Sequence, residues 1–321
     1  MKLAITKYIT EHKLTNRITR FLKQTRFKNT DATYYQIGKQ FIDATKKNHI
    51  QERANNVAFN FVMAIFPTVI FLFTLIPYIP IENLDKHIME FIQPPVLPES
   101  LYESISETIF DIISVQRGGL LSFGFFLALY LSTNGMISLM GAFNRSYRSH
   151  DKRGFIKSRL IATLLTVLMA LIIFIAILLL IIGEVTLDFL TKHGLVFIED
   201  YTIYLLFLLR FIVIFFVFQI GVSTIYYLAP SVKRRWHFFS AGSVLAALAC
   251  VGVSFGFSYY INNFGAYNKL YGSIGALIAI MVWISMLSLI LMLGFELNAS
   301  IEKATGLNKA LNRFLKNEKK V

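Results

Sequence analysis

Tyr226-Tyr227-Leu228-Ala229-Pro230 opens the stretch that decides the fold, residues 225–299. After these five residues come a basic loop, Lys233-Arg234-Arg235, and two apolar runs at 240–261 and 274–295. Each run has about 20 residues, the length that an α-helix needs to cross ~30 Å of hydrocarbon. Neither run has polar residues recurring every 3.6 positions, as a water-soluble helix would have. The stretch therefore predicts a membrane hairpin.

The composition of the whole chain agrees with this interpretation. Of the 321 residues, 55% are hydrophobic and only 16% are charged, and the mean hydropathy is +0.57. Soluble domains carry about 25% charged residues. Cys250 is the single cysteine and lies in an apolar run, so neither an intrachain disulfide nor a cysteine metal site is predicted.

The apolar segments predict an all-α membrane domain over 56–299 with six spans. These spans are 57–76, 120–140, 160–183, 203–228, 240–261 and 274–295. The domain is preceded by a basic N-terminal segment, 1–55, and followed by a basic tail, 300–321. The span at 160–183 is almost purely aliphatic, and we expect it to face lipid.

Two polar segments have amphipathic patterns. The stretch 33–53 predicts one helix with an apolar face, lying on anionic lipid headgroups. The outer loop 77–119 contains two more such helices, at 83–92 and 100–115, which we expect to lie flat at the interface. No nucleic-acid-binding motif accompanies the basic charge, so nucleic acid is not a predicted partner.

Lys and Arg residues are distributed unevenly between the two sides of the six-span arrangement. One side holds 27 of the 32, in segments 1–56, 141–159, 229–240 and 296–321, and the other side holds four. The positive side of a membrane protein is cytoplasmic. Both termini are therefore predicted in the cytoplasm, and this distribution explains the net charge of +13.

Three of the spans carry polar residues at helical spacing, which form stripes entering the membrane. The stripes are Arg53, Asn56, Asn60 and Pro67; Asn134, Ser138, Gly141 and Arg145; and Ser285, Ser288, Met292 and Glu296. The fifth span carries small residues at Gly242, Ala246, Ala249, Gly252 and Gly256, and the spacing of the last two permits close helix packing. The sequence leaves self-association into a homo-oligomer open.

Arg210 lies inside the fourth span, about two turns from its outer end. A charge in a span is costly and usually faces a bundle interior or a watery cavity. Either Arg210 reaches the outer headgroups or pairs with Glu184 or Asp188, or it contacts an anionic or phosphate group of a substrate.

Glu296 closes the sixth span on the predicted cytoplasmic side. One interpretation makes it a structural partner of Arg53 or Arg145, which the topology places at the same interface. The other makes it a proton-coupling carboxylate, because intramembrane acids often carry protons in transporters.

The sequence offers little support for an enzyme. The six histidines are scattered over both sides of the membrane without His-x-His or paired-Asp spacing, whereas phosphodiester hydrolysis needs a metal cluster or an acid–base pair. Walker, dinucleotide-binding and nucleophile-elbow motifs are missing from the chain. We therefore predict no enzymatic activity, no metal and no cofactor.

Over about residues 50–300 the chain resembles the YihY/BrkB family of bacterial inner-membrane proteins, some of which carry the label "ribonuclease BN". The resemblance rests on short motifs in a fixed order. These are Arg53-Ala54, Phe66-Pro67, Gly118-Gly119-Leu120, Asn144-Arg145-Ser146-Tyr147, Tyr226-Tyr227-Leu228-Ala229-Pro230, Tyr271-Gly272-Ser273-Ile274-Gly275, Trp283 and Gly294-Phe295-Glu296-Leu297-Asn298-Ala299. Family members usually carry Tyr-Tyr where this chain has Phe59-Asn60, so no role of an aromatic hydroxyl is carried over to that position.

The resemblance implies six spans, a bacterial cytoplasmic-membrane location, and transport of a lipid-linked or envelope-related compound. We therefore expect a transporter or flippase of an anionic amphiphile, with a path lined by the polar stripes and Arg210. The substrate-path candidates are Arg210, Asn60, Asn134, Ser138, Ser285, Ser288 and Glu296. The alternative is a non-transporting scaffold that holds envelope-synthesis partners through the outer loop 77–119.

Overall fold

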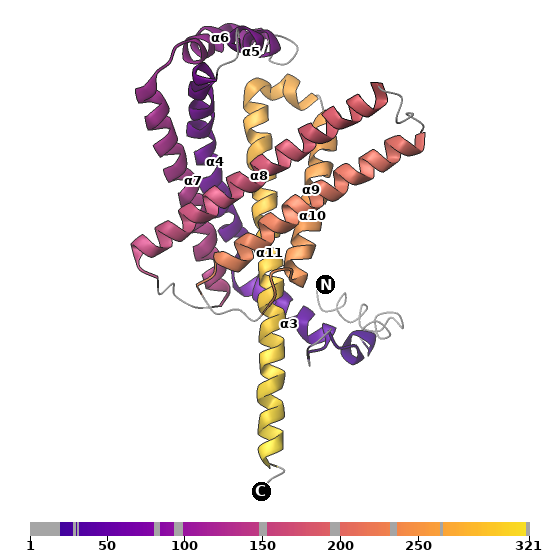
Figure 1. Ribbon diagram of the computed structural model, residues 1–321. Helices are drawn as coiled ribbons and strands as arrows, with labels where there is room; N and C mark the ends of the chain where they lie inside the picture. Colours follow the sequence, from indigo (N-terminus) through magenta and orange to yellow (C-terminus); the bar gives the residue numbers. More distant parts are fainter. Residues whose placement is uncertain are drawn as a thin grey trace.

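The computed structural model describes residues 20–27, 30, 32–79, 84–92, 99–147, 153–192, 200–231, 236–263 and 266–318 (Figure 1). Within these ranges the chain is nearly all helical and contains no strand, which confirms the all-α prediction. The named helices are α3 (Tyr34–Lys47), α4 (Ile50–Leu75), η1 (Ile76–Tyr78), α5 (Leu84–Ile92), α6 (Glu99–Ser114), α7 (Gly118–Ser146), α8 (Phe155–Lys192), α9 (Asp200–Leu228), α10 (Ala241–Asn263) and α11 (Ala266–Glu318).

Among the described residues, six helical segments are long and apolar enough to cross a membrane, which is the number predicted. They are Ile50–Tyr78, Gly118–Ser146, Phe155–Leu179, Phe211–Leu228, Ala241–Ile261 and Ile278–Gly306. Several of the helices run beyond the predicted spans. The 53-residue α11 is about 80 Å long at 1.5 Å per residue, and it projects beyond the foot of the bundle in Figure 1.

The predicted single helix over 33–53 is instead two helices. Thr33 and Gln36 form a capping box that starts α3. His49 then takes a left-handed conformation, φ 46°, which interrupts the helical hydrogen bonding before α4 begins at Ile50. The apolar face of α3 packs against α11, where Ile37 and Ala304 are buried together.

Packing brings the ends of α4, α7, α9 and α11 into one core. Phe143 of α7 stacks on Phe295 of α11 with ring centroids 4.0 Å apart, and Tyr226 of α9 meets both rings edge-on. All three side chains are at most 1% exposed. The Tyr226 hydroxyl donates a hydrogen bond to the Leu291 carbonyl at 2.7 Å, which ties α9 to α11.

In the described part of the chain, a close helix crossing uses only some of the small residues that the sequence singles out in α10. A Cβ at Gly252 or Gly256 would meet nothing within 4 Å, so these glycines are not at a helix contact in the described part of the chain. The close approach is between Gly242 of α10 and Gly294 of α11, where a Cβ on Gly294 would lie 2.7 Å from the Gly242 carbonyl oxygen. Gly242 and Ala246 are among the small residues that the sequence singles out in this span, but the sequence does not show which of them meet another helix.

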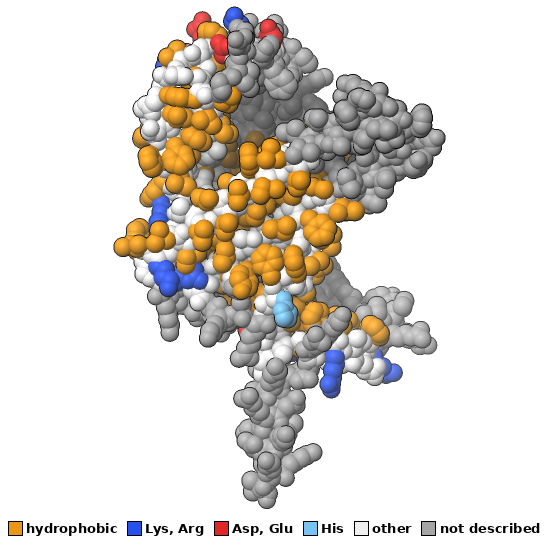
Figure 2. Space-filling model, viewed as in Figure 1, with side chains coloured by type: hydrophobic (Ala, Val, Ile, Leu, Met, Phe, Trp, Pro, Cys, Tyr) orange, Lys and Arg blue, Asp and Glu red, His pale blue; other side chains and the backbone are white. Residues whose placement is uncertain are grey.

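The outside of the bundle is apolar. Figure 2 shows a band of hydrophobic side chains, with Lys and Arg toward its lower edge and Asp and Glu at the upper end. In α8, Phe174 is 58% exposed, and the segment Phe155–Leu179 is the least buried of the six, in agreement with the expected lipid-facing span. The helices α5 and α6 lie across the upper end of α4 and α7 (Figure 1).

Candidate functional site

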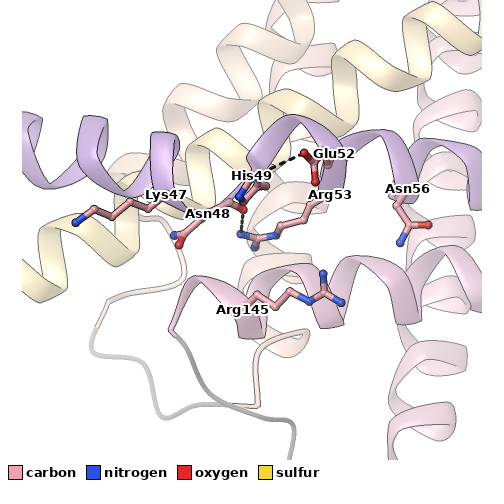
Figure 3. A pocket seen from close by; sticks show the side chains of 7 residues that line it. All are labelled: Lys47, Asn48, His49, Glu52, Arg53, Asn56 and Arg145. Atoms are coloured by element: carbon pink, nitrogen blue, oxygen red, sulfur yellow. Dashed lines mark hydrogen bonds and ion pairs between the residues drawn. The ribbon is translucent and has the colours of Figure 1, made fainter.

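A polar pocket of about 340 Å³ lies at the foot of the bundle, where α3 and α4 meet the end of α7 (Figure 3). Its lining residues are Lys47, Asn48, His49, Glu52, Arg53, Asn56 and Arg145. Three of them are Lys or Arg and one is acidic, so the pocket carries net positive charge. We call it the basic pocket.

The break between α3 and α4 builds most of this pocket. Because His49 turns the chain, Lys47 and Asn48 come to lie beside the first turn of α4. Arg53 and Asn56 are three residues apart and share a face of α4, and Arg145 comes from the last turn of α7. The exposed His49 and Glu52 side chains contact each other at 3.1 Å between Nδ1 and Oε1, so His49, which looked isolated in the sequence, has an acidic neighbour.

Arg53 lies on the floor of the pocket and is only 6% exposed. It donates from Nη1 to the Asn48 carbonyl at 3.2 Å and from Nη2 to Ser146 Oγ at 3.0 Å. These bonds join the start of α4 to the α3–α4 turn and to the end of α7. The orientation of the guanidinium is therefore fixed by contacts within the protein.

Glu296 of α11 lies next to this floor and is fully buried. Its Oε1 accepts a hydrogen bond from Asn48 Nδ2 at 3.2 Å and lies 3.8 Å from Lys303 Nζ. Lys303 also donates to the Ser146 carbonyl at 2.7 Å. The Arg53 guanidinium interacts electrostatically with Glu296, so the buried carboxylate sits among compensating positive charges.

Two buried polar atoms of this network have no hydrogen-bond partner in the described part of the chain, Arg53 Nε and Glu296 Oε2. An unpaired buried polar atom costs about 1–3 kcal/mol. An ordered water molecule beside these atoms would satisfy them. The floor of the basic pocket can thus take up a further hydrogen-bonding partner.

The substrate-path candidates with described side chains do not line the basic pocket, although Glu296 lies next to its floor. Asn60 donates to the Asn56 carbonyl within α4, at 2.8 Å. Asn134 accepts from Arg159 of α8, and Ser285 donates to Asn55 of α4 at 3.1 Å.

Three further candidates complete this set. Ser288 is buried at 3% exposure and Ser138 is half-buried, whereas the side chain of Arg210 lies outside the described residues. Of the predicted stripes, Arg53 and Asn56 from the first and Arg145 from the second meet in the lining of the basic pocket.

Several of the family-motif residues form hydrogen bonds at the end of α9 and at the start of α10. Asn144 Oδ1 accepts from the backbone N–H and the hydroxyl of Ser231, at 2.8 and 2.9 Å. Arg153 donates to the carbonyls of Ala229 and Pro230. Asn298 bonds to Gly242 and Ser240 across the α10–α11 contact.

The remaining motif residues are spread over the bundle. Trp283 donates to Ser254 at 3.2 Å, Tyr227 is 42% exposed, and Pro67 is buried within α4. Gly275 is buried in α11, while the side chain of Tyr271 and the surroundings of Gly272 lie outside the description.

Sequence reasoning missed Asn48, Ser146 as an Arg53 partner, and Lys303. The sequence could have indicated Lys303 as a partner of Glu296, because it lies seven residues later and therefore on the same face of a helix. For Asn48 the sequence gives no such indication, since its contact with Glu296 joins residues 248 positions apart. Among the described residues, no group of three or more His, Cys, Asp or Glu is placed to hold a metal ion.

Comparison with known proteins gives matches along most of the chain. The model of the family described as "Virulence factor BrkB" matches residues 41–317. The "Putative ribonuclease-like protein YfkH" of Bacillus subtilis (strain 168) is 33% identical over 257 residues, which cover 79% of this chain and 90% of that protein.

Two membrane proteins labelled UPF0761 also match. The one from Tolumonas auensis is 35% identical over 81 residues, 25% of this chain and 27% of its own length. The one from Psychrobacter sp. is 24% identical over 273 residues, 84% of this chain and 49% of its own length. No solved structure matches.

Proposed function

Because the chain belongs to the virulence factor BrkB family of membrane proteins, we propose that it is a transporter or flippase of an anionic, lipid-linked compound of the bacterial envelope. In this proposal the protein resides in the cytoplasmic membrane with both termini inside. The basic pocket receives the anionic group of the substrate at the cytoplasmic surface.

The observation that carries the proposal is the charge of the basic pocket above a buried, incompletely bonded Arg53. Lys47 and Arg145 supply two further cations at its wall. A guanidinium binds phosphate or carboxylate through paired N–H donors. A volume of about 340 Å³ falls within the range of small-ligand sites, about 300–1,000 Å³.

Flux in reconstituted liposomes tests the proposal. Purified protein is reconstituted with NBD-labelled phosphatidylglycerol or an NBD-labelled polyprenyl phosphate, and dithionite reports how much label crosses the bilayer. We expect flux of an anionic probe in protein-containing vesicles. Absence of flux above protein-free vesicles, for both probes, would favour the scaffold alternative.

Charge variants then test the role of the basic pocket. We expect Arg145→Gln and Lys47→Gln to lower flux about tenfold each, because each removes a charged hydrogen-bond donor. Lys46→Gln is the matched control, since Lys46 is exposed beside Lys47 and does not line the pocket. Equal flux in all three variants and the natural protein would show that the basic pocket does not take part in transport.

The contact between His49 and Glu52 supports a second test, since an imidazole paired with a carboxylate can act in acid–base chemistry. Both side chains are well exposed, at 70% and 79%, which is typical of a solvated surface pair. RNA hydrolysis by the purified protein that disappears in His49→Ala would favour the activity in the name of the Bacillus subtilis relative over transport.

A further inference from the structure

A second concave surface lies on the outside of the bundle, between α7 and α8. It is a groove of about 470 Å³, which we call the α7–α8 groove. Phe123, Phe126 and Tyr130 of α7 line it and are 64%, 67% and 57% exposed. In a membrane such side chains face hydrocarbon, so the groove opens toward lipid and not toward water.

One cation lies in this apolar groove, Arg159 of α8. Its Nη1 donates to Asn134 Oδ1 at 2.5 Å, and its Cζ lies 4.1 Å from the centroid of the Tyr130 ring. These contacts hold the guanidinium at the groove. A guanidinium has five N–H donors, so donors remain after the bonds to Asn134 and to the Tyr130 carbonyl.

The arrangement along the helices fits a lipid of one leaflet. Arg159 contacts the Tyr130–Asn134 part of α7, and the apolar lining continues from there to Phe123. Ten residues separate Phe123 from Thr133, about 15 Å at 1.5 Å per residue, which is half of the ~30 Å hydrocarbon thickness. Arg159 lies close to the start of α8 at Phe155, near the exposed Lys157.

We propose that the α7–α8 groove binds an anionic glycerophospholipid of the surrounding bilayer, with its phosphate at Arg159 and one acyl chain along Phe126 and Phe123. Charge complementarity favours a lipid over a protein partner. If the apolar face of a protein covered the groove, the remaining N–H donors of Arg159 would have to find hydrogen-bond acceptors inside the hydrocarbon. Headgroup phosphate pairs with these donors and an acyl chain covers the aromatic lining. The proposal is independent of the transport function.

Native mass spectrometry of the full chain in detergent, titrated with dioleoyl phosphatidylglycerol, tests this site. We expect a bound lipid whose affinity falls about tenfold in Arg159→Gln, since a charged hydrogen-bond donor is lost. Lys157→Gln is the matched control because Lys157 is an exposed cation two residues away that does not line the groove. Its lipid affinity should equal that of the natural protein.

A second variant keeps the test decisive if Arg159→Gln unfolds. Leu127→Trp fills the groove and leaves Arg159 unchanged, so it should also weaken lipid binding. Unchanged lipid affinity in folded Arg159→Gln or in Leu127→Trp would overturn the proposal. If the chain forms dimers and Leu127→Trp dissociates them, the groove is a self-association surface, and this result too would overturn the proposal.

Discussion

Asn298 joins two helices through a single buried amide. Its Oδ1 accepts from the Gly242 backbone N–H at 2.8 Å, and its Nδ2 donates to Ser240 Oγ at 2.7 Å. The side chain is 3% exposed. Gly242 belongs to the first turn of α10, whose backbone N–H groups have no partners within the helix, so Asn298 works as a cap supplied by α11.

We expect Asn298→Ala to lower the free energy of unfolding by about 2–3 kcal/mol, because it leaves a buried N–H and a buried hydroxyl without this partner. Thermal unfolding of the purified protein in detergent measures the loss. Asn60→Ala is the control, since Asn60 bonds within its own helix, and it should unfold at nearly the natural temperature. Equal effects of the two variants would contradict the capping role.

The predicted substrate contact of Arg210 rests on its position inside the fourth span of the sequence. If its guanidinium contacts an anionic substrate, Arg210→Ala should abolish flux in liposomes while the protein still accumulates in the membrane. Immunoblotting of membrane fractions provides the control for insertion. A variant that accumulates normally and transports at the natural rate would remove Arg210 from the substrate path.

At the scale of elements, α10 and α11 approach most closely where two glycines face each other. A Cβ on Gly294 would lie 2.5 Å from the Tyr226 hydroxyl and 2.7 Å from the Ala246 Cβ. A Cβ on Gly242 would clash with the Gly294 carbonyl oxygen. The backbones can approach this closely only because neither position carries a side chain.

Alanine substitution should therefore have opposite effects at two glycines of the same helix. Gly242→Ala overpacks a backbone contact, and we expect it to destabilise the protein by at least about 1–3 kcal/mol. Gly252→Ala meets open space and should be neutral or stabilise by up to about 1 kcal/mol, because Ala favours the helix. Similar thermal unfolding temperatures for both variants would refute the crossing.

At the scale of the whole molecule, the distribution of charge predicts the orientation. Of the 32 Lys and Arg residues, 27 fall in segments that six spans place on one side, and the positive-inside rule predicts that this side is cytoplasmic. The helix α3, whose end borders the basic pocket, lies at the foot of the bundle, and α5 and α6 lie at the opposite end (Figure 1).

Cysteine labelling checks this orientation, because the single natural cysteine, Cys250, is buried and can be replaced by Ala. In that background, Val115→Cys should react with a membrane-impermeant maleimide in intact spheroplasts. Lys39→Cys should react only after permeabilisation. Both native residues are exposed, so access to the reagent depends on the side of the membrane, and the reverse labelling pattern would invert the topology.

Composition and segment length alone predict the six apolar helices that the described residues contain. Hydrocarbon offers no hydrogen bonds to the backbone, so an apolar segment of sufficient length must satisfy its own as a helix. This is a property of each segment and needs no knowledge of its neighbours. The family motifs were equally readable, because each is a local run of residues, such as Gly294-Phe295-Glu296.

Which helix faces meet cannot be read from the segments one by one and follows from the packing of the folded chain. Gly252 and Gly242 are the same residue in one apolar helix, and the position of α11 alone makes the second the contact. Likewise the sequence placed Glu296 at the end of the sixth span, but its contact with Asn48 depends on how the α3–α4 turn meets α11. Hydropathy fixes the burial of a segment in the membrane, whereas the rotation and neighbours of each helix follow from close packing between segments far apart in the chain.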